Sequence, residues 1–406
     1  MKRIVAFLGM TIFASALFCE TLKIDVKQKP ITGGFADLGK LSYSKKKVVV
    51  IDDANYPDAK KKRVAFTNAI SQRSETLIIL GGDVDLSDGR VSDTDHSYFD
   101  TFDKGTHKRK NDDFSFPISS NKTIIGKENA RIMFGGLRID SGKNIVIRNI
   151  TFYDAHGATE YDTNFVAESK ASADALVIWD KKSSIPQDIW IDHCTFTDGM
   201  CDDMSRNFNH DGSIDICGGK NVTISWCEFT NHDKVMLVAL GDKFTDPKER
   251  QITLHHNYFH HVTQRLPRSR GTYMHIYNNV YDDIGVSGNV GYMFGPGIAS
   301  QYIVEGNYLG SHLGTIVNYF DKSKLEEHTY SNFYASKNSS EITEADVKWD
   351  GPEKSKSFIS HFVTSLEKMP WRVSYKYDLE TWQDALSRVK EEAGSSKAVE
   401  ITGDKK

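Results

Sequence analysis

The sequence predicts an all-β fold, a right-handed parallel β-helix with a short N-terminal helix and a C-terminal helix packed on the coil. Two observations carry this prediction. Six ten-residue segments align without gaps, each with apolar residues at its third and fifth places and a large apolar residue at its tenth. Three of them have asparagine at the eighth place, and no helical period separates the copies. Units that cannot bury their own apolar face must stack on copies of themselves.

The six segments alternate apolar and polar residues at period two, which is typical of half-buried strands. They are Lys143–Phe152, Gln187–Phe196, Lys220–Phe229, Arg250–Phe259, Thr272–Tyr281 and Ser300–Leu309. Stacked coils would lie ~4.8 Å apart. The third places would then form one inward apolar column, made of Ile145, Ile189, Val222, Ile252 and Met274. The eighth-place asparagines would bridge from coil to coil and satisfy buried amides, namely Asn257, Asn279 and Asn307.

The intervals between these segments are longer and rich in Gly, Asp and Ser. Three of them, 153–186, 197–219 and 230–249, are expected to be loops ejected from one side of the coil. Loops on a rigid scaffold often carry function, so the search for a site begins there.

The first residues form a separate unit. Lys2 and Arg3 precede an uncharged apolar run with small residues near Ala16. This pattern predicts a secretory signal peptide over 1–16, because the run is shorter than the ~20 residues that a membrane span needs. We therefore expect a secreted protein, extracellular or periplasmic, with no membrane span. A transmembrane anchor and a lipid on Cys19 are the alternatives.

Residues 17–406 are expected to form a single β-helix domain. Its predicted parts are an N-terminal cap at about 20–75, coils at about 76–345 and a C-terminal flank at about 346–406. The cap contains a predicted helix at Asp58–Ser71, where a basic and an apolar side recur at helical spacing. The flank contains a second, at Tyr377–Gly394, which we expect to pack across an end or flank of the coil.

Composition excludes one class of partner and allows a sizeable core. The net charge of −4 argues against nucleic acid as the main partner, and 39% hydrophobic residues are ample for a core. A monomer is expected. Cys194 and Cys227 hold equivalent places in two segments and could be small buried residues. With Cys201 and Cys217, an exported chain could instead form disulfides, for which three pairings exist.

Charged residues gather between Asp211 and Arg270, on or beside successive strands. Asp211 and Asp215 lie four residues apart, with Gly212 between them, and a bend at Gly212 would bring them together. Asp174 could join them if these segments lie on adjacent coils. Oxygen ligands at loose geometry suit Ca²⁺. The alternative is that these are surface aspartates, which exported β proteins carry in number.

Four basic residues accompany those acids, Lys234, Arg265, Arg268 and Arg270, and Pro267 stiffens the loop between the arginines. Ordinary surface ion pairs are the alternative explanation. A site that joins Ca²⁺ with several cations would suit a substrate bearing many carboxylates.

The motifs WIDHCTF, DGSIDI, VTISWCEF, NHDKVML, HHNYFHHVTQRLPRSRG and HIYNNVY resemble those of the pectate lyases, polysaccharide lyase family one. The resemblance is dense from about 130 to 310 and looser in the C-terminal YKYDLETWQDAL. It implies a secreted parallel β-helix enzyme. Such an enzyme cleaves α-1,4-linked, de-esterified polygalacturonate (pectate) by Ca²⁺-dependent β-elimination, leaving 4,5-unsaturated oligogalacturonides.

The resemblance also assigns roles by position. Asp174, Asp211 and Asp215 match the primary calcium ligands. Arg265 matches the catalytic base. Lys234 and Arg270 match the residues that bind substrate carboxylates, and Arg268 is expected to bind substrate beside them. Some members have a fourth acid where this chain has Ser172. The ion would then be held more weakly until the substrate supplies oxygens.

The expected chemistry agrees with these roles. The C5 proton of galacturonate is weakly acidic because its carbanion lies next to the carboxylate, whose charge Ca²⁺ and nearby cations can stabilise. An arginine is ordinarily protonated at neutral pH. The nearby ion, Lys234 and Arg270 would favour the neutral form of Arg265, so we expect an alkaline optimum.

Other functions stay open. A pectin lyase would act on methyl-esterified polymer without calcium, and a β-helix adhesin or carbohydrate-binding protein would not catalyse at all. A hydrolase could use Asp202 and Asp203. The histidines, including His193 and His232, lack a spacing typical of zinc and are expected to pack and form hydrogen bonds. One or both of Trp190 and Trp226 are expected in the core rather than on a sugar-binding surface.

Overall fold

The computed structural model describes eleven stretches of the chain. They are residues 24–26, 33–36, 47–93, 115–155, 174–180, 184–199, 210–285, 291–320, 331–350, 360–397 and 401–403. The predicted signal peptide at 1–16 lies outside the described residues, as do Cys19, Ser172, Cys201, Asp202 and Asp203. No helix within the described stretches is long and apolar enough to cross a membrane.

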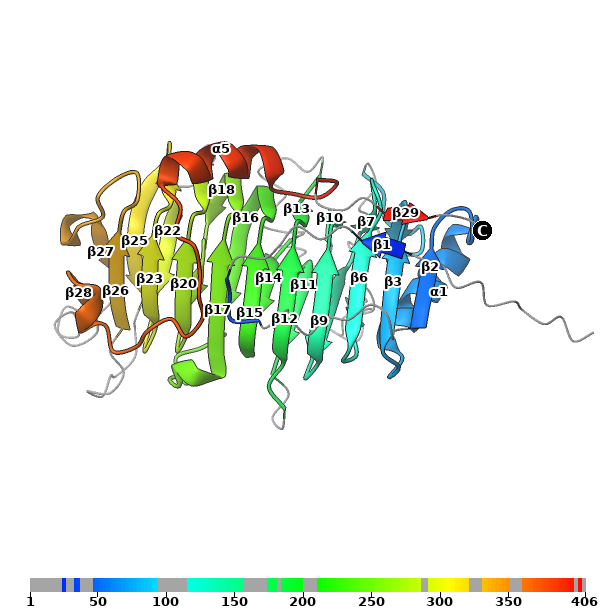
Figure 1. The fold of residues 1–406 in the computed structure, drawn as a ribbon, viewed down its shortest axis with the longest axis horizontal. Coiled ribbons are helices and arrows are strands. Elements are labelled where there is room, and N and C mark those ends of the chain that lie inside the picture. The colour runs from blue at the N-terminus through cyan, green and yellow to red at the C-terminus, as the bar shows by residue number, and fades with distance from the viewer. Residues whose placement is uncertain are drawn as a thin grey trace, which may run out of the picture.

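An eleven-stranded sheet runs along the whole stack (Figure 1). Its neighbouring strands are parallel throughout. In spatial order they are β2 (Lys47–Ile51), β3 (Thr76–Leu80), β6 (Lys122–Gly126), β9 (Lys143–Arg148), β12 (Gln187–Asp192), β15 (Gly219–Ser225), β17 (Arg250–His255), β20 (Tyr273–Tyr277), β23 (Gln301–Glu305), β26 (Ser331–Ser336) and β28 (Ser360–Val363). Each of the six predicted segments supplies one strand of this sheet, and its last residues begin a second strand beyond a corner. The repeat is confirmed as the unit of a parallel β-helix.

The other strands of the coils form two rows that meet in the long strand β16 (Glu228–Val238) and make one sixteen-stranded sheet. The first row contains β4 (Asp83–Asp85), β7 (Arg131–Met133), β10 (Thr151–Tyr153), β13 (Thr195–Thr197), β18 (Tyr258–Gln264), β21 (Val280–Ile284) and β24 (Tyr308–Leu309). The second, called the site row below, contains β5 (Ser115–Pro117), β8 (Gly136–Asp140), β11 (Leu176–Trp179), β14 (Gly212–Ile216), β19 (Arg268–Ser269), β22 (Gly291–Pro296), β25 (Gly314–Phe320) and β27 (Val347–Asp350).

The site row corrects the predicted loops. The interval 153–186 contains β11, 197–219 contains β14, and 230–249 begins with most of β16. These strands were missed because segments such as LVIW and GSIDI are short and lack the ten-residue pattern. The stack is also longer than the predicted 76–345, because β2 pairs with β3 at one end and β28 pairs with β26 at the other.

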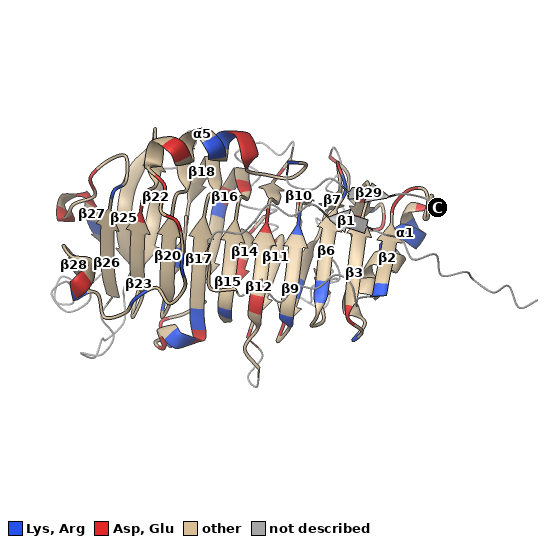
Figure 2. Ribbon diagram, in the orientation of Figure 1, with Lys and Arg blue, Asp and Glu red and all other residues tan. Residues whose placement is uncertain are grey.

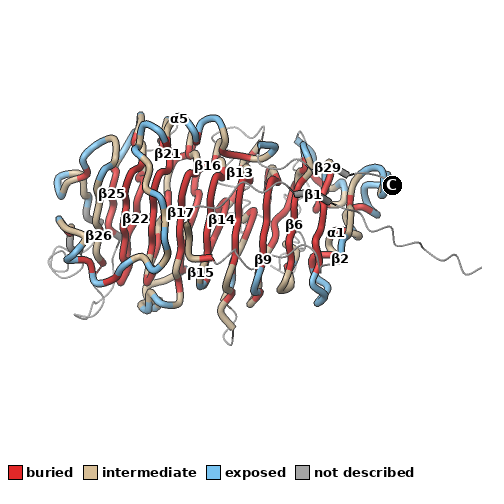
Figure 3. Tube along the Cα trace, in the orientation of Figure 1, coloured by how far each residue is buried: buried red, intermediate tan, exposed pale blue. Residues whose placement is uncertain are grey.

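The core is built from equivalent places of successive coils. The predicted inward column consists of register partners, each fully buried: Ile145, Ile189, Val222, Ile252 and Met274. The tenth-place rings also stack, with centroids 4.8 Å apart for Phe152 and Phe196 and 5.1 Å apart for Phe196 and Phe229. Figure 3 shows that burial follows the strands, while exposed residues gather at the turns.

The predicted asparagine ladder is present. Asn257 Nδ2 donates to Asn279 Oδ1 at 2.9 Å, and Asn279 Nδ2 donates to Asn307 Oδ1 at 3.0 Å. A further rung, Asn338 Oδ1, accepts from Asn307 Nδ2 at 3.0 Å. The ladder gives these buried amides partners whose loss would be costly.

Each coil turns a corner as it leaves the eleven-stranded sheet. His193, Trp226 and His256 stand at equivalent corners with φ of 47°, 53° and 55°, in the left-handed region that non-glycine residues rarely adopt. Their rings stack, with centroids 5.7 Å and 4.4 Å apart. Trp226 is buried at its corner and Trp190 is fully buried in β12, so both tryptophans belong to the packing.

Within the described stretches, two α-helices flank the stack (Figure 1). α1 (Ala59–Ser71) confirms the predicted helix at Asp58–Ser71 and packs on β2, β3, β4 and β5. α5 (Trp382–Glu392) lies against β21 and β24. It begins later than the predicted Tyr377 because Thr381 forms its N-cap. Tyr377 instead uses its hydroxyl to donate to Glu305 Oε1 at 2.6 Å.

After α5 the chain contacts earlier coils, towards the N-terminal end of the stack. Ser395 N donates to Thr195 Oγ1 at 3.0 Å, and β29 (Ile401–Gly403) pairs antiparallel with β1 (Ile24–Val26). The described residues include three short 3-10 helices. η3 (Pro247–Glu249) and η5 (Glu344–Asp346) connect strands, and η7 (Leu366–Lys368) lies between β28 and α5. The flank therefore packs along the coil, as predicted.

Candidate functional site

The register of the site row places residues distant in sequence beside one another. β14 lies between β11 and β16, with Gly212 opposite Lys234. On the next coil, Lys234 is opposite Gln264, which directly precedes Arg265. Asp174 precedes β11, and its Oδ1 accepts a hydrogen bond from Gly212 N at 2.6 Å. Parallel stacking thus carries the predicted residues to neighbouring strands.

Asp174 and Asp215 converge at Gly212. A Cβ placed on Gly212 would stand 2.6 Å from Asp215 Oδ1 and 2.8 Å from Asp174 Oδ1, so only glycine leaves room for both carboxylates. Asp215 Oδ1 also accepts from Leu237 N at 3.0 Å. Asp174 and Asp215 therefore approach each other across Gly212, whereas the bend at Gly212 was predicted to bring Asp211 and Asp215 together.

The pKa values of both converging acids are raised. Burial, and then the charge of Asp211, raises the pKa of Asp215 to about 7. Burial, and then the charges of Asp215 and Asp211, raises the pKa of Asp174 well above its ordinary value. Crowded, buried carboxylates of this kind mark a place where added positive charge is favourable.

Asp211 forms an ion pair with a lysine. Its Oδ1 accepts from Lys234 Nζ at 2.9 Å, with the Lys234 side chain 3% exposed and the Asp211 side chain 32% exposed. Among the described residues, no group of three or more His, Cys, Asp or Glu side chains is gathered closely enough to form a ready-made metal site. The structure therefore brings together two of the three predicted calcium ligands and pairs the third with the predicted substrate-binding lysine.

The three arginines lie on the same side of the stack. Arg265 is partly exposed and adopts φ of 61°, and its carbonyl accepts from Met236 N at 2.9 Å. Its positive charge lowers the pKa of Asp215, against the larger effect of burial. Burial lowers the pKa of Arg268, and the charges of Arg270 and Arg265 lower it further. Arg265 is thus neither locked in the interior nor remote from the acids.

Arg270 is held by its own contacts. Its Nε donates to Asp242 Oδ1 at 2.6 Å, and its Nη1 donates to the Ala239 carbonyl at 3.1 Å. Its side chain is 13% exposed. A guanidinium fixed in this way presents its remaining donors with little rotamer freedom to lose.

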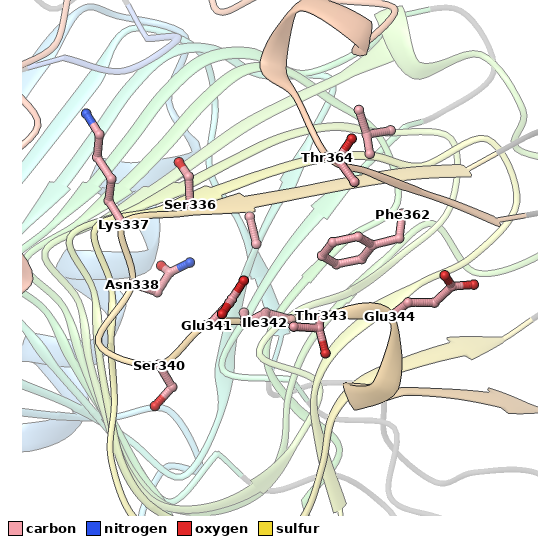
Figure 4. A pocket seen from close by; sticks show the side chains of 12 residues that line it. Ser336, Lys337, Asn338, Ser340, Glu341, Ile342, Thr343, Glu344, Phe362 and Thr364 are labelled. Carbon is pink, nitrogen blue, oxygen red and sulfur yellow. The ribbon is translucent and has the colours of Figure 1, made fainter.

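Other features lie away from these residues. A pocket lined by residues 335–338, 340–344 and 362–364 is at the β26–β28 end of the stack and contains none of the predicted site residues (Figure 4). Acidic and basic residues are interspersed along the stack rather than separated into fields of one sign (Figure 2). The described cysteines Cys194, Cys217 and Cys227 are buried and free, so no disulfide is formed within that part of the chain.

Comparison with known sequences decides the family. The profile of a family described as pectate lyase matches residues 10–398, nearly the whole chain. The chain belongs to the pectate lyase family.

Individual members of the pectate lyase family align over shorter stretches. The pectate trisaccharide-lyase of Thermotoga maritima is 37% identical over 191 residues, which cover 44% of this chain and 45% of the relative. The pectate lyase of Bacillus subtilis is 34% identical over 205 residues, which cover 47% and 48%. The chain thus aligns with about half the length of these curated relatives.

Solved structures of pectate lyases match more of the chain. A thermostable pectate lyase has a TM-score of 0.65 at 25% identity and covers 91% of this chain and 98% of its own. The pectate lyase of Acidovorax avenae subsp. citrulli has a TM-score of 0.64 at 18% identity and covers 96% and 99%. The predicted parallel β-helix fold is confirmed.

Two residues near the pectate lyase motifs were not named as site candidates from the sequence. Tyr292 on β22 is mostly buried, which raises the pKa of its hydroxyl, while Arg268 and Arg265 act on it in the opposite direction. Trp179 ends β11 with 39% of its surface exposed. Neither stands in a charged motif, so only the order of strands in the site row could have found them.

Proposed function

We propose that the protein is a secreted, Ca²⁺-dependent pectate lyase that cleaves α-1,4-linked polygalacturonate by β-elimination and leaves 4,5-unsaturated ends. The observation that carries the proposal is the convergence of Asp174 and Asp215 at Gly212, with Lys234 on the next strand and Arg265 after the strand beyond. Acids and fixed cations side by side suit a polymer that bears one carboxylate per sugar. A solved pectate lyase with a TM-score of 0.61 is bound to a hexasaccharide.

Asp174 and Asp215 fit a calcium ion by the chemistry of their donors. Calcium takes carboxylate oxygens at flexible geometry. Burial, and then the charges of neighbouring aspartates, raise the pKa values of both acids, so added positive charge would be favourable there. Asp211 would complete the set from its place beside Gly212. When bound, Ca²⁺ supplies charge stabilisation to the sugar carboxylate and so acidifies the adjacent C5 proton.

Lys234 and Arg270 would bind and orient the substrate carboxylate, with Arg268 beside them. The Lys234 ammonium is fixed on Asp211 and the Arg270 guanidinium on Asp242. Because these groups are ordered before the polymer arrives, less side-chain entropy is lost on binding. Their charge faces the position where the carboxylate becomes more negative in the transition state.

Arg265 would remove the proton. The backbone holds it on both sides, because its carbonyl accepts from Met236 N at 2.9 Å and Leu266 N donates to the Met293 carbonyl at 2.7 Å. In its neutral form the guanidine accepts the C5 proton, and the C5–H electron pair becomes the second bond between C4 and C5. The C4–O bond breaks, and the departing oxygen takes a proton from water. Requirement for the neutral form gives an alkaline optimum.

The deciding experiment follows the ultraviolet absorbance of unsaturated uronates during digestion of polygalacturonate. We expect absorbance to rise with added Ca²⁺ and to stop rising with EGTA. In Arg265→Ala the rate of this rise should fall by several orders of magnitude, with Arg265→Lys as the conservative control. Activity on methyl-esterified polymer that resists EGTA would instead show a pectin lyase. Saturated products would show a hydrolase, and polymer binding that survives Arg265→Ala without cleavage by the wild type would show a binding protein.

Export is part of the same proposal. Expression in a secreting host is expected to yield a protein whose N-terminus follows Ala16. An N-terminus that still begins at Met1 in the exported fraction would contradict the predicted signal peptide.

A further inference from the structure

A chain of buried acids and histidines leads from the first row of strands to the site. His210 Nε2 lies 2.6 Å from Asp154 Oδ1, and His210 Nδ1 lies 3.7 Å from Asp198 Oδ2. His232 Nδ1 lies 2.7 Å from Asp198 Oδ1. These four side chains are at most 5% exposed. They are not among the residues that would touch substrate or calcium.

His232 is the end of this chain that reaches the site. Its Nε2 lies 3.1 Å from the Asp211 carbonyl oxygen and 3.0 Å from the Lys234 carbonyl oxygen. Carbonyl oxygens only accept, so Nε2–H donates to both. The ring therefore connects two adjacent coils at the two residues whose side chains form the 2.9 Å ion pair.

The other ring nitrogen is fixed as well. Burial alone would raise the pKa of Asp198, but His210 and His232 hold it below its ordinary value, so this carboxylate is an acceptor. His232 Nδ1 lies 2.7 Å from Asp198 Oδ1, so each ring nitrogen has a polar partner. With a partner at each end, the ring has one orientation, and it cannot turn without breaking contacts on both coils.

We propose that His232 is a positioning residue that sets the spacing between the backbones of Asp211 and Lys234. Through them it holds the Lys234 ammonium on the Asp211 carboxylate, one residue before Gly212, where Asp174 and Asp215 converge. This role rests on the proposed function, because it acts on the proposed calcium and substrate groups. Residues that orient metal ligands from behind typically change metal affinity or activity by about 10- to 100-fold when replaced.

The chain offers a matched control. His193 is also buried and also lies against an aspartate, with Nδ1 2.6 Å from Asp192 Oδ2. It stands at a corner of the eleven-stranded sheet, and its Nε2 is buried without a hydrogen-bond partner. A purely structural histidine should therefore behave like His193, whereas a positioning histidine should affect the site.

The test compares His232→Gln with His193→Gln at one fixed alkaline pH. The measurements are the Kd for Ca²⁺ by titration calorimetry, kcat and KM on polygalacturonate, and the melting temperature without calcium. We expect His232→Gln to weaken Ca²⁺ binding by about 10-fold or more, with a matching fall in kcat/KM. His193→Gln should lower the melting temperature and leave the Kd within about twofold of the wild type.

Two further measurements keep the test decisive if His232→Gln does not fold. Nitrogen-15 NMR of the wild type should show a hydrogen on Nε2 of His232, and an Nε2 without hydrogen would overturn the inference. Asp198→Asn, which keeps a hydrogen-bonding group against Nδ1, should weaken Ca²⁺ binding less than His232→Gln. An equal or greater loss of Ca²⁺ affinity in Asp198→Asn would show that Asp198, and not His232, is the positioning residue.

Failure of this inference can be told from failure of the proposed function. A wild type with no Ca²⁺-dependent cleavage would remove the proposed function and the positioning role with it. An active wild type whose His232→Gln variant binds Ca²⁺ as tightly, while losing heat stability as His193→Gln does, would remove the positioning role alone.

Discussion

Gly212 offers the most selective perturbation of the converging acids. Its φ is not in the left-handed region, so its backbone accepts alanine. The new methyl would stand 2.6 Å from Asp215 Oδ1 and 2.8 Å from Asp174 Oδ1, closer than carbon and oxygen tolerate. The ends of two short side chains must move, while the fold need not. Gly212→Ala is therefore expected to damage the ion site and leave the coil intact.

The magnitude can be followed by heat stability. An ion that binds only the folded state at a concentration of 100 times its Kd stabilises that state by ~2.7 kcal/mol, and a 100-fold loss of affinity leaves ~0.4 kcal/mol. Without calcium, Gly212→Ala should melt close to the wild type, because a backbone-compatible Gly→Ala change itself contributes only ~0.4–1 kcal/mol. The assay is thermal unfolding with Ca²⁺ and with EGTA.

The control for that experiment is Gly241→Ala. No atom lies within 4 Å of the position that a Cβ on Gly241 would take. This variant should keep the full calcium-dependent rise in melting temperature. If Gly212→Ala also keeps the full rise, then Asp174 and Asp215 do not hold the ion together, and the reasoning about their convergence is wrong.

Two predictions concern the scaffold. Burial opposes ionisation of Asp192, but His193 and other neighbours together outweigh the effect of burial. They lower the pKa of Asp192 to about 2, against ~3.9 for a free aspartate. A carboxylate with a lowered pKa adds stability above about pH 4 that is lost as the pH falls towards 2, here ~2–3 kcal/mol. Urea unfolding of Asp192→Asn should show that loss at neutral pH and a shallower acid dependence; wild-type stability at neutral pH would contradict it. Phe229 stacks between Phe196 and Phe259, with centroids 5.1 Å and 4.8 Å away. Phe229→Ala should lower the free energy of unfolding by ~3–5 kcal/mol, and a loss below ~1 kcal/mol would show that the ladder carries little of the stability.

The repeat could be predicted because the same place in every coil meets the same environment. Asn257, Asn279 and Asn307 recur in sequence since each needs the next to satisfy a buried amide. A stack of parallel coils turns such a pattern directly into contacts. The same logic explains why the inward column could be predicted from the sequence.

Strands without that pattern were not visible. β11 and β14 were assigned to loops, although they carry the site row past Asp174 and Asp215. Their register, with Leu176 opposite Ile214, is what brings the acids together, and the long intervals before them conceal it. The start of α5 was also misplaced, because Tyr377 belongs to a helical pattern in sequence but bonds to Glu305 on the sheet.

The candidate site, too, could be predicted from the sequence only in part. Residue types and their order were enough to nominate Asp174, Asp211, Asp215, Lys234 and Arg265. The pairing of Asp211 with Lys234 and the backbone contacts of His232 depend on which coil lies on which, so charge and spacing alone could not supply them.

The most direct test is a crystal structure of Arg265→Lys with Ca²⁺ and an oligogalacturonate. We predict an ion bound by Asp174 and Asp215, with a sugar carboxylate reaching both that ion and the cations Lys234 and Arg270. Sugar and ion bound elsewhere on the stack, with these two acids left without metal, would contradict the proposed site.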